Sequence, residues 1–135
     1  MILGLDISTS IIGATILSDD GEVKETFAWD MRNKNHFPDI FTKYNHVQGE
    51  FLDMLASRDI EYIFIEQSLQ MFRSGFSSAK TLSTLASFNG VVSYLCYREF
   101  GIKPEYISAS SARKACGITI SRGTKAKEQV IKFLL

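Results

Sequence analysis

The sequence has few of the residues and segments that would assign it quickly to a class. It contains only two cysteines, Cys96 and Cys116, without the spacing of a metal-binding pair, so we expect buried free thiols in a reducing compartment. Its two histidines, His36 and His46, lie near no second type of ligand, which favours surface or capping roles. No apolar run approaches the roughly 20 residues that span a bilayer, and the amino terminus lacks a cleavable signal segment. We therefore expect a soluble, cytoplasmic protein.

The chain also has no net charge, but only because the opposite charges of its two halves cancel. Residues 1–66 carry five Lys or Arg against twelve Asp or Glu, a net charge of minus seven, and residues 67–135 carry ten against three, a net charge of plus seven. An acidic half joined to a basic half suggests a metal-binding carboxylate cluster beside a surface for an anionic polymer. Solvated faces of unequal charge are the alternative.

The length of the chain limits its architecture. A chain of 135 residues that is 45% hydrophobic is long enough for one domain with a substantial core, which we expect to occupy residues 1–135. It is too short for the two-domain ATP-binding folds that begin in a similar way.

The first carboxylate, Asp6, stands between two apolar runs. Residues 2–5 and 11–17 predict strands, which would place Asp6 at a strand end that faces a tight turn. The small neighbours Ser8, Thr9, Ser10 and Gly13 would let a phosphate or a metal ion approach the backbone. The alternative is a turn aspartate that is satisfied by its own backbone.

The rest of the chain alternates strand and helix patterns. Further strands are predicted over residues 22–29, 60–66 and 103–108, the last at a sheet edge, and helices over 37–55 and 78–100. The apolar face of the first helix would comprise Phe37, Ile40, Phe41, Tyr44, Val47, Phe51, Met54 and Leu55, and that of the second Leu82, Leu85, Ala86, Asn89, Val92, Cys96, Tyr97 and Phe100.

Glu66 repeats the setting of Asp6, because it ends the apolar run Ile60-Glu-Tyr-Ile-Phe-Ile. The intervening helix makes this strand parallel to the first, so both carboxylates should emerge at one sheet edge. Two adjacent carboxylates repel each other and stay ionised only with a cation between them, and oxygen ligands favour Mg²⁺ or Mn²⁺.

Two further segments suggest contacts with nucleic acid. The predicted loop over residues 67–78 contains Leu69, Phe72 and Arg73, which would stack on bases or, alternatively, pack on the core or on a second subunit. Residues 103–132 hold seven basic residues against two acidic ones, and a last helix is predicted to begin near Gly123. Gly90 in the middle of the second helix suggests close approach of another backbone, either the sheet or a dimer mate.

These motifs together resemble the RuvC family of Holliday junction resolvases, within the ribonuclease-H-like superfamily. Asp6-Ile-Ser-Thr-Ser-Ile-Ile-Gly13 looks like its first motif and Ile65-Glu66-Gln67 like its second. Leu82-x-x-Leu-Ala-x-x-x-Gly90 resembles its dimer-side helix, and Gly123-x-x-x-Lys127-Glu-Gln-Val130 its phosphate-binding helix start. The resemblance implies an α/β fold, with a five-stranded mixed sheet of a three-stranded meander and two parallel strands, flanked by helices.

The resemblance also implies an activity and its residues. The protein would be a phage or bacterial endonuclease of DNA recombination and repair that hydrolyses phosphodiesters in four-way junctions as a homodimer, paired through the 78–100 helix. Asp6 and Glu66 would bind Mg²⁺ or Mn²⁺, with one ion activating a water and one stabilising the leaving 3′ oxygen. The DNA contacts would come from Leu69, Phe72, Arg73, Arg113, Lys114, Arg122, Lys125 and Lys127.

One departure from the family pattern is large. The family completes its site with two further acids, or an acid and a histidine, on a final helix, whereas only Glu99, Glu105 and Glu128 follow Glu66 here. The first two fall on the wrong elements, and the third matches a non-catalytic position. We therefore expect a C-terminally truncated chain that lacks its final helix, with the remaining ligands beyond Leu135 and little activity in this form.

Two rival functions remain open. An actin-like or sugar-kinase-type ATPase also begins with an aspartate and a Ser/Thr-Gly turn, but it would need a second phosphate motif and a second lobe. A catalytically incomplete DNA-binding member of the same fold would account for the basic second half as well as an enzyme does. Within the enzyme class, strict junction resolution competes with broader debranching of forks or flaps.

Overall fold

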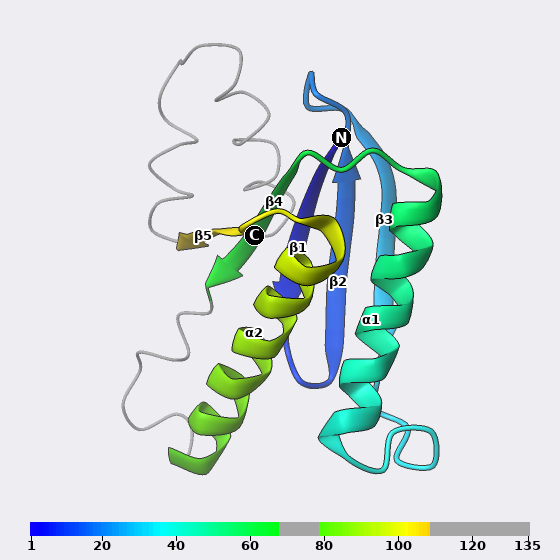
Figure 1. Cartoon of the computed structure of the whole chain (residues 1–135). Helices are drawn as coiled ribbons and strands as arrows, with labels where there is room; N and C mark the ends of the chain where they lie inside the picture. The colour runs from blue at the N-terminus through cyan, green and yellow to red at the C-terminus, as the bar shows by residue number, and fades with distance from the viewer. Residues whose placement is uncertain (68–78, 109–135) are drawn as a thin grey trace.

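The computed structural model describes residues 1–67 and 79–108, which form a five-stranded sheet and two long helices (Figure 1). The strands are β1 (Ile2–Ile7), β2 (Ile11–Leu17), β3 (Val23–Asp30), β4 (Tyr62–Gln67) and β5 (Glu105–Ser108), and the helices are α1 (Ile40–Ser57) and α2 (Ala79–Phe100). The predicted order of elements is confirmed. The last predicted helix, near Gly123, lies outside the described residues.

The sheet has the mixed topology expected from the sequence. Its strand order is β3-β2-β1-β4-β5, with β1 antiparallel to β2, β2 antiparallel to β3, and β4 parallel to both β1 and β5. A chain that leaves β3 at one edge must pass through α1 before β4 can run beside β1 in the same direction, and the crossover through α2 does the same for β5. The sheet is therefore a three-stranded meander extended by two parallel strands, with β5 at the edge.

Both helices pack on the same face of the sheet (Figure 1). Side chains of a strand alternate between faces, so Leu3, Leu5 and Ile7 of β1 share the helix-covered face, and all three are buried. The opposite face receives Gly4 and Asp6 instead. The buried residues of the helices that pack against this core are Val47, Phe51 and Met54 from α1 and Phe88, Val92 and Cys96 from α2.

Local signals fix where the helices and turns begin and end. The Asp39 carboxylate caps α1 by accepting a hydrogen bond of 2.9 Å from the backbone N–H of Thr42. Gly101 ends α2 with a φ of 70°, and its N–H donates to the carbonyl oxygen of Tyr97 at 2.9 Å. Gly21 takes a φ of 91° in the turn between β2 and β3, where a residue with a Cβ would be strained.

The expected apolar faces of the helices are partly wrong. On α1, Phe41 and Leu55 are 69% and 45% exposed, and on α2 Tyr97 is 54% exposed. Phe88, absent from the predicted face, is fully buried. Spacings of three and four residues allow more than one stripe on a helix, and contact with the sheet selects the stripe that is buried.

The expectation of a buried free thiol is confirmed for Cys96. Cys96 is a buried free thiol in α2, and burial raises the pKa of this thiol to about 12. Cys116 lies outside the described residues. Within residues 1–67 and 79–108, no helix combines the length and the apolar composition that crossing a membrane requires.

We expect Phe88→Ala to lower the free energy of unfolding by about 3–5 kcal/mol, because it opens a cavity between α2 and the sheet. Chemical denaturation measures this change. Leu52→Ala is the control: Leu52 lies on the outer side of α1, is 47% exposed, and should change the free energy of unfolding by less than about 0.5 kcal/mol. Equal losses for the two variants would contradict the described packing of α2.

Candidate active site

Asp6 projects from the face of the sheet opposite to α1 and α2. Strand β1 runs to Ile7, one residue past Asp6, so the carboxylate stands on the last but one residue of the strand, close to the strand end that was expected. Five of the six residues of β1 are buried, and Asp6 is the exposed one. Asp6 therefore stands at the edge of the core with its carboxylate open to a ligand.

Glu66 is the parallel neighbour of Asp6. The register of β1 and β4 pairs Leu5 with Ile65 and Asp6 with Glu66, so the two carboxylates lie side by side on the same face. Their carboxyl groups hydrogen-bond to each other. The predicted convergence of Asp6 and Glu66 is thus present in the fold. A turn aspartate satisfied by its own backbone would not make this bond.

The pair holds a proton unusually well. Partial burial, the negative charge of Asp6 and the hydrogen bond with Asp6 together raise the pKa of Glu66 to about 7. Partial burial also raises the pKa of Asp6, and the hydrogen bond to Glu66 opposes that rise. Just below pH 7, the two carboxyl groups therefore share one proton, which is lost as the pH rises through about 7. A cation of higher charge could take the place of that proton.

Gly13 leaves room over Asp6 from the other side. The antiparallel register of β1 and β2 places Gly13 opposite Asp6, and a Cβ on Gly13 would lie 3.8 Å from the Asp6 Cβ. The turn between the strands is built by Ser8, whose Oγ accepts from the N–H of Ile11 at 3.0 Å and donates to the Ile11 carbonyl at 2.6 Å. Asp6 is thus flanked by small residues, and the turn holds its shape without using the Asp6 carboxylate.

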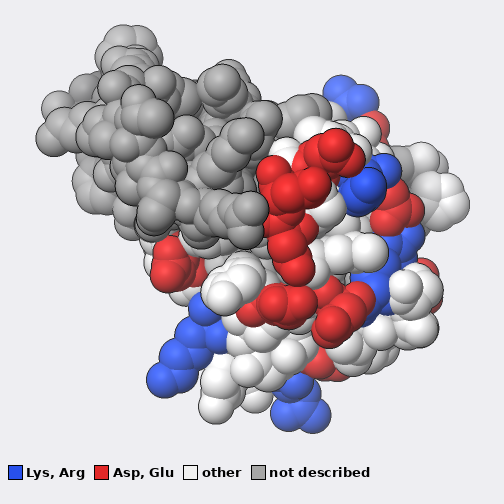
Figure 2. Space-filling view, turned by 90° about the horizontal axis from the view of Figure 1, so that it is seen from above, with Lys and Arg blue, Asp and Glu red and all other residues white. Residues whose placement is uncertain are grey.

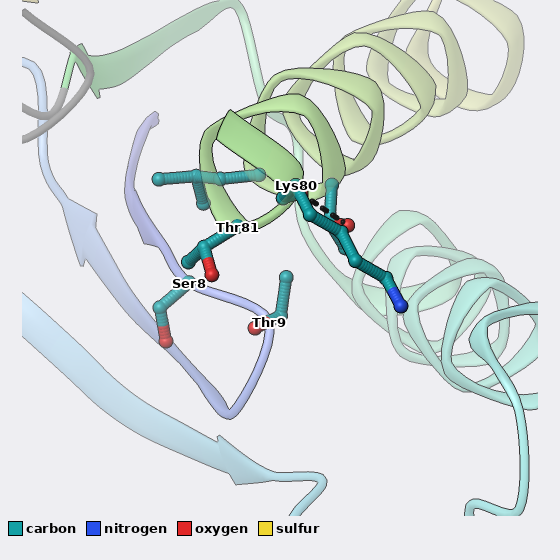
Figure 3. Close-up of a pocket in the computed structure, with 6 residues that line it drawn as sticks. Ser8, Thr9, Lys80 and Thr81 are labelled. Atoms are coloured by element: carbon teal, nitrogen blue, oxygen red, sulfur yellow. Dashed lines mark hydrogen bonds between the residues drawn. The ribbon is translucent and has the colours of Figure 1, made fainter. Parts of the chain in front are cut away.

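Two hollows flank this turn. One has a volume of about 380 Å³ and is lined by Ser8, Thr9, Lys80, Thr81, Thr84 and Leu85 (Figure 3). In Figure 3 the Thr81 side chain faces Ser8 and Thr9, whereas the Lys80 side chain extends away from the hollow toward α1. The other hollow, of about 510 Å³, has Ser10, Arg32, Lys34 and Lys43 in its lining. The Lys43 ammonium, which lines the second hollow, donates a hydrogen bond to the carbonyl oxygen of Thr9, which lines the first.

Most acids of the N-terminal half lie away from the site. Asp19 and Glu61 are 3.2 Å and 3.8 Å from the amino terminus, which is at the opposite end of β1 from Asp6. Figure 2 looks onto that end and shows carboxylate side chains gathered there. The charge imbalance therefore predicted a larger carboxylate cluster than the two residues that meet. In the described part of the chain, no group of three or more His, Cys, Asp or Glu could hold a metal ion.

The other candidate residues divide into two groups. Glu99 lies on α2 and accepts a hydrogen bond of 3.1 Å from Gln48 of α1, and Glu105 lies in β5 opposite Phe64. His36 is exposed, and His46 is 3.8 Å from Glu50. The remaining candidates, which lie outside the described residues, are Leu69, Phe72, Arg73, Arg113, Lys114, Arg122, Lys125, Lys127 and Glu128.

The sequence analysis missed the basic residues that surround the turn. Arg32, Lys34 and Lys43 belong to the acidic half, and Lys80 was read only as part of a helix. Their positions in the sequence could have revealed them, because each basic residue comes shortly after the end of β3 or the beginning of a helix. These points of the chain lie at the same end of the sheet as Asp6 and Glu66. Average charge over a long segment conceals such a local gathering.

The sheet topology and the covering helices define a ribonuclease-H-like fold. A solved structure with this fold, T. thermophilus RuvC in complex with Holliday junction substrate, superposes with a TM-score of 0.69 over 96% of this chain and 89% of that chain. The two sequences are 9% identical, so the likeness establishes the fold. No protein-family model matches the sequence, and no curated protein matches it.

The raised pKa of Glu66 predicts how the metal-free protein responds to pH. Because the folded state favours the protonated form, its stabilising contribution is complete below the ordinary glutamate pKa of 4.5 and is lost as pH rises through about 7. We expect the free energy of unfolding to fall by on the order of 1 kcal/mol from about pH 5 to about pH 8, a modest change because solvent reaches the pair. Urea denaturation over this range measures it.

Glu66→Gln should remove most of this pH dependence, whereas Asp53→Asn, an exposed acid on α1, should leave it intact. Adding Mg²⁺ near pH 8 should raise the free energy of unfolding of the unmodified protein more than that of Glu66→Gln. A pH dependence that persists unchanged in Glu66→Gln would contradict the shared proton.

Proposed function

We propose that this protein is a divalent-metal-dependent endonuclease that hydrolyses phosphodiesters in branched DNA, with the four-way junction as the first candidate substrate. The observation that carries the proposal is the pairing of Asp6 and Glu66 in parallel register on the face of the sheet opposite to α1 and α2. The ribonuclease-H-like fold supports it, because the similar T. thermophilus RuvC structure contains a Holliday junction substrate. Fold alone does not imply function, so the main support for the nuclease proposal is the carboxylate pair.

The two carboxylates suit a hard cation. Mg²⁺ and Mn²⁺ prefer oxygen ligands, and Mg²⁺ is commonly bound through one or two carboxylates together with waters and substrate phosphate. Asp6 and Glu66 offer those oxygens from two neighbouring strands, and their shared proton marks the position where positive charge is favoured. When bound, such an ion activates water and offsets charge at the phosphate.

The chain's own residues would set the geometry of the reaction. Hydrogen-bonded main chains on both sides of β1 fix Asp6, and Glu66 stands on a strand whose residues Ile63, Phe64 and Ile65 are buried. Neither carboxylate can then move far when a phosphate approaches. The missing side chain at Gly13 keeps the approach to Asp6 open. This rigidity would hold the metal-binding oxygens in place through the reaction.

The proposed DNA contacts outside the carboxylate pair remain predictions. Leu69 and Phe72, with Arg73 beside them, are proposed to wedge into the branch point, and the basic residues of the C-terminal part are proposed to hold the phosphate backbone. Arg113, Lys114, Arg122, Lys125 and Lys127 make up this second group.

The second candidate function is a DNA-binding protein with an incomplete catalytic site. One observation favours it: the described residues bring together two metal-ligating side chains at the site and no third. Such a protein would bind branched DNA through the same basic residues without cutting it. Cleavage assays with Mg²⁺ on junctions, forks and linear duplex, alongside binding assays on the same DNAs, distinguish the two functions.

A homodimer formed through α2 is part of the proposal. Gly90 lies on the outer side of α2, and a Cβ placed there would meet no atom of the described structure within 4 Å. Of the two partners expected for this glycine, the sheet of its own chain is therefore excluded. A second copy of α2 could pack against the small residues that are exposed along this helix, which are Ser83, Ala86, Ser87 and Gly90.

Asp6→Asn and Glu66→Gln should each reduce Mg²⁺-dependent cleavage of a four-way junction by more than about 100-fold, because changing only the partners of metal ligands already costs 10- to 100-fold. Junction binding should remain within a few-fold of the unmodified protein. Asp59→Asn, an exposed acid at the opposite end of β1, is the matched control and should cut normally. Unimpaired cutting by Asp6→Asn would refute the nuclease proposal.

Gly90→Arg should raise the dissociation constant of the homodimer at least about ten-fold, as measured by sedimentation equilibrium. Gly49→Arg is the matched control, because Gly49 is also an exposed helical glycine with nothing within 4 Å of its Cβ, but lies on α1. Replacing either glycine should favour its helix by up to about 1 kcal/mol. If Gly90→Arg and Gly49→Arg associate equally well, α2 is not the dimer interface.

A further inference from the structure

Basic side chains of the N-terminal half gather at one end of the molecule. This half contains five Lys or Arg residues. Lys24 and Arg58 pair with Glu22 and Glu25, so their charge is offset locally. The other three, Arg32, Lys34 and Lys43, line the hollow beside Ser10 at the end of the sheet where β1 ends.

Lys80 of α2 adds a fourth cation on the other side of the same turn. It lines the hollow that contains Thr9, and Lys43 donates to the Thr9 carbonyl oxygen from α1. Arg32 is bound to Asp30 through two hydrogen bonds of 2.9 Å and 2.7 Å. Lys34 and Lys80 are exposed and make no ion pair within residues 1–67 and 79–108. Their charges are therefore available to an anionic ligand.

An aromatic ring accompanies these lysines. Phe41, in the first turn of α1, is 69% exposed, the highest value among the large hydrophobic side chains of the described structure. Its ring meets Tyr44 edge to face with centroids 5.9 Å apart, and Tyr44 stacks on the buried Phe88 at 5.5 Å. This aromatic row runs from the core to the surface and holds the Phe41 ring in place while leaving it open to solvent.

Phe41 and Lys80 lie at the same end of the helix pair. The stacked rings of Tyr44 and Phe88 join α1 to α2. Phe41 comes one turn before Tyr44, and Lys80 comes about two turns before Phe88, so both stand where the two helices begin (Figure 1). The Lys80 side chain extends toward α1 (Figure 3).

We propose that Lys34, Lys43, Lys80 and Phe41, here called the strand-binding surface, bind an unpaired nucleic acid strand. The lysines contact its phosphates, and one base stacks on Phe41. Lysine ammonium groups suit phosphate as point charges, and an exposed aromatic ring accepts the face of any base, which is available only when that base is unpaired and unstacked. The proposal deepens the proposed nuclease function, on which it rests, because it supplies a path for one strand of a branched substrate at the end of the sheet that carries Asp6 and Glu66.

Phe41→Trp provides a direct reporter of this contact. Trp29 is the single tryptophan of the chain and is buried, so a tryptophan at position 41 would respond separately to a stacked base. We expect single-stranded oligothymidine to quench the fluorescence of Phe41→Trp strongly and with saturation. Leu52→Trp, at an exposed position farther along α1, should not be quenched beyond the unmodified protein. Equal responses of the two variants to bound DNA would overturn the proposal.

Affinity measurements test the lysines and the ring independently. Phe41→Ala should weaken binding of fluorescently labelled oligothymidine roughly ten-fold, and Phe41→Trp should retain it, because stacking and not side-chain size alone is required. Lys34→Gln with Lys80→Gln should also weaken binding and reduce the slope of log affinity against log salt by about 1.4. Lys24→Gln, at an exposed lysine of β3 away from the turn, should change neither quantity.

The outcomes separate this proposal from the nuclease proposal. If the protein binds four-way junctions and cuts them through Asp6, but the Phe41 and lysine variants behave like their controls, only the strand-binding surface is refuted. Binding of no nucleic acid of any form refutes both proposals. A tryptophan at position 41 whose emission shifts to the blue with rising protein concentration, without DNA, would show that Phe41 contacts another protein chain and would also overturn the proposal.

Discussion

The parallel pairing of β1 with β4 is the constraint on which the rest of this structure depends. These two strands form the centre of the sheet, and their register alone brings Asp6 beside Glu66. A shift of β4 by one residue would turn Glu66 toward the helices and Ile65 toward the opposite face, so burial of Ile63 and Ile65 against the helices holds the register that the carboxylate pair requires. Core packing and the site are therefore fixed by the same contacts.

The fold holds two carboxyl groups, those of Asp6 and Glu66, close enough to repel each other when both are ionised. Two carboxyl groups on neighbouring strands are partly removed from water, and the result is a shared proton and a raised pKa for Glu66. Elsewhere in the described structure the acids are mostly exposed or paired with cations, as for Asp30 with Arg32 and Glu25 with Arg58. Perturbed pKa values of this kind often accompany function, and here they occur near a turn whose neighbouring hollows are lined by basic side chains of other elements.

Much of the fold could be predicted because local patterns agreed with tertiary packing. The strand over residues 11–17 was predicted with its observed bounds, and the helix predicted over residues 78–100 ends at Phe100, as α2 does. Asp6 and Glu66 could be predicted as site residues because each is a carboxylate that interrupts or ends an apolar run. The errors occurred on the helices: Phe41 was assigned to the core and Phe88 was not, because periodicity defines the possible stripes of a helix without saying which one the sheet will cover.

The sequence by itself determined the order of strands and helices, the parallel direction of β4 and the two acids that meet, because these follow from short-range periodicity and from the geometry of crossovers. Only the tertiary structure decided that acids such as Asp19 and Glu61 would stand at the far end of β1. It also decided that Lys34, Lys43 and Lys80 would line the hollows beside the turn after Asp6, and that the ring of Phe41 would stay exposed in the first turn of α1. Charge totals and helix periods carry no information about which ends of separate elements become neighbours, and that is set when the sheet and its helices pack.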